Sequence, residues 1–156
     1  MSDQTPSTVP RAKTGPSPAS IASGLSAGSI VGTVLSSLNL MTVGLMGGRL
    51  GEGLFMLIFS LPVTSFFWIS GLLLIGAPSW ALLHWIGLTR RWAGAVLGGT
   101  ITPLCIQPLI GPGNILDPNH RMGWPDPATN LATFGAIGAI VGWVVVRVAY
   151  GKDAPR

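Results

Sequence analysis

The chain has 156 residues, of which 48% are hydrophobic and only 9% are charged, and its mean hydropathy is +0.57. Soluble domains carry about 25% charged residues, so this composition argues against an ordinary soluble domain and favours an integral membrane protein. The formal net charge of +4 does not indicate nucleic-acid binding, because the basic residues lie at the ends of apolar segments, where they set membrane orientation.

The N-terminal part of the chain combines a polar tail with a first apolar segment. Residues 1–20 are rich in proline, serine and threonine without apolar periodicity, which predicts a disordered tail. Residues 21–47 are uncharged and long enough to cross a hydrocarbon core of roughly 30 Å. Gly24, Gly28 and Gly32 recur every four residues on one helix face, where they would let another backbone approach closely. We therefore expect this helix to be surrounded by protein.

The most hydrophobic segment, residues 54–88, contains no Asp, Glu, Lys or Arg. A soluble helix would keep one polar face, so the natural solvent of this segment is lipid. A straight helix of this length would exceed the bilayer core, and Gly76 and Pro78 offer a break. We predict a span over residues 54–75 and a short interfacial helix over residues 79–87; one kinked helix through the whole segment is the alternative.

Two more spans complete a transmembrane domain over residues 21–150. They are predicted at residues 92–110 and 128–149, and the segment between them contains too many prolines for a regular helix. Residues 151–156 form a C-terminal tail. The four-residue glycine spacing recurs in both spans, at Gly94, Gly98, Gly138 and Gly142. The predicted fold is therefore an all-α, four-helix integral membrane bundle.

The basic residues predict the orientation of the four spans. An even number of spans places both termini and the loop after the second span on one side of the membrane. That side collects seven of the nine Lys and Arg residues, namely Arg11, Lys13, Arg90, Arg91, Arg147, Lys152 and Arg156. Because Lys and Arg concentrate on the cytoplasmic face, both termini are predicted to be cytoplasmic in a bacterial inner membrane. Indoles and arginines at headgroup level are expected at Trp80, Trp85, Arg90, Arg91, Trp92 and Trp124.

Two amides are the strongly polar side chains inside the first and third predicted spans, Asn39 and Gln107. Either could line a pathway or form a hydrogen bond to a neighbouring helix, and we favour the hydrogen bond. No predicted span places an acidic side chain or a histidine at depth, which argues against a proton-coupled carrier or pump.

Patterns that carry catalysis or metal binding are missing from the sequence. The single cysteine, Cys105, excludes an intramolecular disulfide and is expected to behave as a small buried hydrophobe. His120, Asp117 and Asp126 share a proline-rich loop and supply too few rigid ligands for zinc. No Gly-x-Ser-x-Gly, His-Glu-x-x-His or phosphate-binding glycine motif occurs. We predict a protein without enzymatic activity, cofactor or metal.

The overall pattern resembles small four-span proteins of bacterial inner membranes, and this resemblance implies no particular activity. The leading hypothesis is a structural or accessory subunit that contacts lipid and associates with itself or a larger membrane complex through its glycine faces. A small oligomeric transporter or channel is the first alternative. A lipid-modifying intramembrane enzyme, with His84, Arg90 and Arg91 near the lipid headgroups, is the second, although His84 is more simply explained as an interfacial residue beside two tryptophans.

Overall fold

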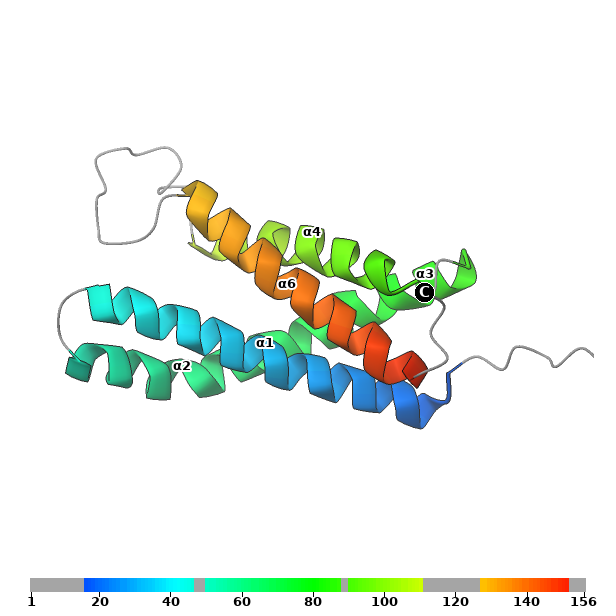
Figure 1. The fold of residues 1–156 in the computed structure, drawn as a ribbon, viewed down its shortest axis with the longest axis horizontal. Helices are drawn as coiled ribbons and strands as arrows, with labels where there is room; N and C mark the ends of the chain where they lie inside the picture. The colour runs from blue at the N-terminus through cyan, green and yellow to red at the C-terminus, as the bar shows by residue number, and fades with distance from the viewer. Residues whose placement is uncertain (1–15, 47–49, 88–89, 111–126, 152–156) are drawn as a thin grey trace, which may run out of the picture.

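The computed structural model describes residues 16–46, 50–87, 90–110 and 127–151 (Figure 1). All regular structure within these ranges is helical, which confirms the predicted all-α class. The predictions for the rest of the chain, including the anchor Trp124, lie outside the described residues. In chain order the helical elements are α1 (Pro18–Met46), α2 (Leu50–Gly71), η1 (Leu72–Gly76), α3 (Ala77–Trp85), α4 (Arg91–Ile110) and α6 (Pro127–Tyr150).

Three of the described helices are long and apolar enough to cross a membrane, which supports a membrane protein. They cover Pro18–Met46, Leu50–Trp85 and Ala128–Tyr150, with 29, 36 and 23 residues. The 20-residue α4 is not among these three.

The second of these helices runs without interruption from Leu50 to Trp85, because η1 joins α2 to α3. In place of the predicted break at Gly76 and Pro78 there is one π-helical turn, in which the Ala77 N–H donates to the Leu72 carbonyl five residues earlier. Proline lacks an N–H, and in an α-helix its ring would clash with the carbonyl four residues before it. The wider turn accommodates the ring while the helix continues.

The helices pack as two antiparallel pairs, and one helix of each pair contacts the other pair. α1 packs along α2, α4 packs along α6, and α1 contacts α6 (Figure 1). The starts of α1 and α4 and the ends of α3 and α6 lie at the same end of the molecule, on the right of Figure 1. We call this the basic end, because Arg90, Arg91 and Arg147 belong to it.

Most of the buried hydrophobic side chains lie on α6. Ile137, Val141 and Val145 recur every four residues and form a buried cluster, and Val141 is only 1% exposed. Apolar residues of α1, together with Trp68 and Leu72, pack against this cluster. The core is therefore thin and follows the α1–α6 contact.

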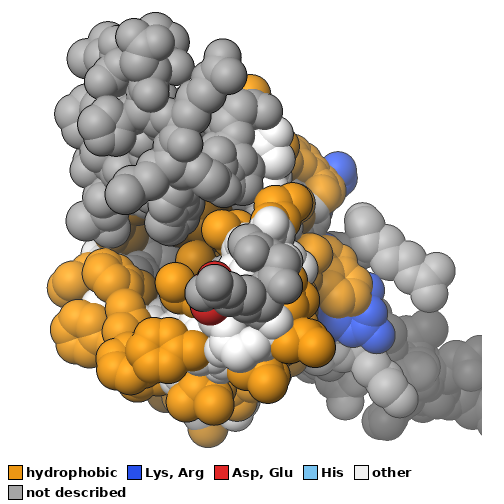
Figure 2. All heavy atoms as spheres, turned by 90° about the vertical axis from the view of Figure 1, so that its left-hand side faces the viewer, with side chains coloured by type: hydrophobic (Ala, Val, Ile, Leu, Met, Phe, Trp, Pro, Cys, Tyr) orange, Lys and Arg blue, Asp and Glu red, His pale blue; other side chains and the backbone are white. Residues whose placement is uncertain are grey.

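The outward face of α2 is apolar along its length. Phe55, Ile58, Phe59 and Phe66 are each more than half exposed, and the rings of Phe55 and Phe59 stack at 4.9 Å. Seen from the end where α1 meets α2, the described surface is mostly hydrophobic (Figure 2). A soluble monomer rarely exposes a continuous apolar surface of this extent, whereas lipid covers such a surface without penalty.

Candidate functional site

The closest helix contact in the described structure is the seam between α4 and α6, which we call the α4–α6 seam. Gly94 lies against Gly142, and Gly98 lies against Gly138. A Cβ added at Gly94 would lie 2.8 Å from the Gly142 carbonyl oxygen and 2.5 Å from a methyl carbon of Val146. The two backbones can approach this closely only because these positions carry no side chain.

A second seam joins α1 to α6 and again uses glycine on one side. At Gly24 an added Cβ would lie 2.8 Å from the Val145 carbonyl oxygen and 3.2 Å from the Ala149 Cβ. Gly28 faces Val141 and Val145 one turn further along. In this seam β-branched side chains of α6 fill the space that the glycines of α1 leave open.

The seam between α1 and α2 is polar, unlike the other two. Gly32 lies against the ring of Trp68, whose indole N–H donates to the Ser36 Oγ at 2.9 Å. One residue further along α1, the Ser37 hydroxyl is 3.0 Å from the Thr64 hydroxyl, and Ser37 is completely buried. An unpaired hydroxyl is costly in a lipid environment. Each of these two hydrogen bonds pairs a polar side chain of α1 with one of α2, and together they fix the register of the two helices.

Sequence reasoning did not identify this hydroxyl network, and counting residues outward from the close contact between the two helices would have misplaced it. Successive antiparallel helices are expected to pair residues whose numbers add to a nearly constant sum. Gly44 lies opposite Gly53, which would place Ser37 opposite Ser60, whereas Ser37 meets Thr64 one helical turn further along. The hydroxyl-bearing residues of the two helices therefore indicate a polar seam but not its register.

The two predicted polar contacts at depth have different outcomes. Asn39 is half-buried, and the bond recorded for it uses its backbone carbonyl, which accepts from the Thr42 hydroxyl at 2.6 Å. Gln107 belongs to α4, but its side chain lies outside the described residues. Cys105 was expected to be buried, whereas its side chain is exposed on α4, on a face that no other described helix covers.

Three aromatic rings of α3 and α6 meet at the basic end. The His84 Nδ1 lies 2.9 Å from the Tyr150 hydroxyl oxygen, and His84 stacks on Trp80 with ring centroids 5.6 Å apart. One turn before Tyr150, the Arg147 guanidinium carbon lies 4.8 Å from the centre of the Trp143 ring, a cation–π contact. This cluster fastens the end of α3 to the end of α6, a contact that the predicted interfacial role of His84 did not include.

The predicted interface anchors that the structure describes all belong to the basic end. Trp85 and Trp92 are 85% and 54% exposed, Arg90 is exposed, and Trp80 is half-buried. Arg91 is also half-buried, and its Nε has no hydrogen-bond partner among the described residues. Exposed indoles near arginines at one end of apolar helices are typical of the membrane–water interface.

No group of three or more His, Cys, Asp or Glu side chains that could hold a metal ion occurs in the part of the chain that the structure describes. Comparisons of the chain with protein-family models, with curated proteins and with solved structures found no match.

Proposed function

We propose that the protein is a small, non-enzymatic, multi-pass protein of a bacterial inner membrane that serves as a structural or accessory subunit. Its four spans would be α1, the helix from Leu50 to Trp85, α4 and α6. α4 packs along the full-length span α6 through paired glycines, so it would share the same bilayer depth.

The distribution of charge supports an orientation with both termini in the cytoplasm. All Lys and Arg residues within the described ranges, namely Arg90, Arg91 and Arg147, belong to the basic end. Lys and Arg concentrate on the cytoplasmic side of inner-membrane proteins. Since α1 begins and α6 ends at the basic end, both tails would leave the membrane there.

The observation that carries the proposed role is where the close-packing surfaces lie. The glycines that recur every four residues face other helices of the same chain, so a partner would meet a different surface. They are Gly24, Gly28, Gly32, Gly94, Gly98, Gly138 and Gly142. The outward face of α2 is the best candidate, because it is apolar, aromatic and uncovered by the described helices. A partner helix or second copy would pack there in competition with lipid.

Chemical cross-linking in native membranes, followed by purification in mild detergent, tests the proposed role. We expect cross-linked species heavier than the 16.2 kDa chain, and we expect Phe59→Ala to reduce them. Ile140→Ala is the matched control, because Ile140 is 46% exposed on the outward side of α6. A purely monomeric protein that catalyses saturable solute flux in liposomes would refute the accessory role and favour the transporter alternative.

A further inference from the structure

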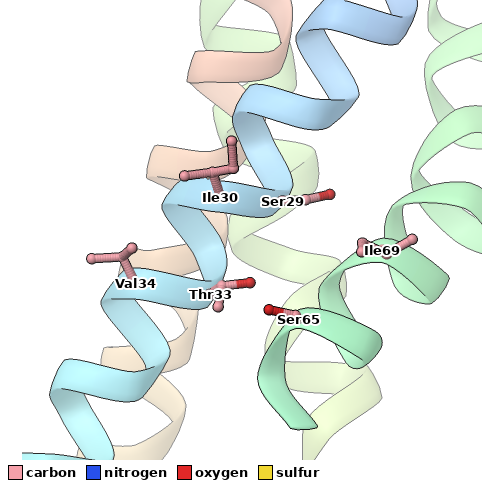
Figure 3. Close-up of a pocket in the computed structure, with 6 residues that line it drawn as sticks. All are labelled: Ser29, Ile30, Thr33, Val34, Ser65 and Ile69. Carbon is pink, nitrogen blue, oxygen red and sulfur yellow. The ribbon is translucent and has the colours of Figure 1, made fainter. Parts of the chain in front are cut away.

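A pocket of about 170 Å³ lies between α1 and α2, beside the polar seam of these two helices and lined by residues that the seam contacts do not use. It opens toward the outer surface, since Ile30 and Ile69 at its rim are 65% and 49% exposed. Its lining consists of three apolar and three hydroxyl-bearing side chains, Ser29, Ile30, Thr33, Val34, Ser65 and Ile69 (Figure 3).

One residue in this lining is buried as a whole, although its hydroxyl has no partner within the described residues and stays accessible from the pocket. The buried serines Ser36, Ser37 and Ser60 each have a side-chain hydrogen bond, whereas the structure records none for the Thr33 hydroxyl. Thr33 is 8% exposed, and its hydroxyl points into the pocket toward that of Ser65, which is likewise unpaired within the described residues (Figure 3). The Ser29 hydroxyl, by contrast, already donates to the Leu25 carbonyl at 3.0 Å.

The depth of the pocket limits what can satisfy these two hydroxyls. Thr33 is near the middle of the 29-residue α1, about 20 Å from either end at 1.5 Å per residue. If α1 spans the bilayer, the pocket lies near the bilayer centre and opens toward acyl chains. An occupant must therefore dissolve in the bilayer and carry no charge, and it must offer at least one hydrogen-bonding atom.

We propose that this pocket binds a neutral, lipid-soluble molecule with a six-membered ring that carries a hydrogen-bonding oxygen, as in phenols and quinones. A cavity of about 150 Å³ is known to hold one benzene molecule, so the volume here suits a single ring. Ile30, Val34 and Ile69 pack against the ring. Thr33 and Ser65 bind its oxygen, and because a hydroxyl both donates and accepts, either a phenol or a ring carbonyl fits.

The test compares 4-fluorophenol with fluorobenzene as probes of the full-length protein in detergent micelles, read by fluorine NMR. We expect saturable binding of 4-fluorophenol about five-fold tighter than that of fluorobenzene, the effect of one ordinary hydrogen bond. Thr33→Val combined with Ser65→Ala should abolish this preference. Thr100→Val should keep it, because the exposed Thr100 hydroxyl donates to the Val96 carbonyl of its own helix.

Several outcomes would overturn the proposal. Equal affinity for the two probes in the unaltered protein would mean that the pocket selects only for apolar volume, as it would for an acyl chain. Absence of saturable binding, or a preference that survives in the double variant, would contradict the assignment of Thr33 and Ser65. If the double variant does not fold, Thr33→Ser and Ser65→Ala separately must keep and weaken the preference, respectively.

Discussion

Adding one methyl group at Gly94 tests whether the α4–α6 seam holds the protein together. An alanine Cβ there would lie 2.8 Å from the Gly142 carbonyl oxygen, whereas ordinary contacts begin at 3.4 Å. The neighbouring Gly142 backbone cannot rotate away as a side chain would, so the helices must move apart by about half an ångström. A gap of that size forfeits roughly a quarter of the dispersion energy between facing atoms.

We expect Gly94→Ala to lower the free energy of unfolding by about 1–3 kcal/mol, the usual range for overpacking. The control is Gly71→Ala, since a Cβ at Gly71 meets no atom within 4 Å and alanine favours the helix by about 1 kcal/mol. SDS titration in mixed micelles, followed by circular dichroism, measures both variants. Equal unfolding midpoints for the two variants would refute the view that the α4–α6 seam depends on the missing side chain.

The remaining predictions concern the polar seam, the basic end and the orientation. Trp68→Phe should destabilise the protein by about 1 kcal/mol in the same titration, because it leaves the Ser36 hydroxyl unpaired, whereas Trp92→Phe at an exposed position should change little. Tyr150→Phe removes the contact with His84 and should increase amide hydrogen exchange at the end of α3 without changing the α4–α6 seam. Fluorescent reporters that mature only in the cytosol should be bright on both tails, and one dark tail would overturn the predicted threading.

The sequence carried enough information for the helices and for their small-residue faces. A long run without charges lacks the polar face that a solvent-exposed helix needs, and glycines four residues apart must lie on one face, so both conclusions follow from local geometry. The partner of each face does not follow. Gly24 and Gly28 contact α6, whereas Gly32, on the same face of α1, contacts Trp68 of α2. The angles between the helices determine where the contact with α6 ends and the contact with α2 begins.

Local reasoning also had limits at the proline and at the pocket. Pro78 has no N–H, so one helical hydrogen bond must be lost there. Either a break in the helix or a π-helical turn can accommodate the proline ring, and the structure has the π-helical turn. The unpaired state of Thr33 depends on its rotamer and on how far α2 stands from α1 at that level. Neither quantity is encoded in residue spacing.

The π-helical turn at Leu72–Gly76 changes the direction in which the faces of one continuous helix point. Each turn of this kind holds about one extra residue, so everything beyond it is rotated by about 100° around the axis. Trp68, before the turn, reaches α1, and His84, after it, reaches the last residue of α6. One helix can therefore contact two neighbours that lie on different sides of it. Deleting one residue at this turn would remove the rotation, so one of the two contacts would be lost.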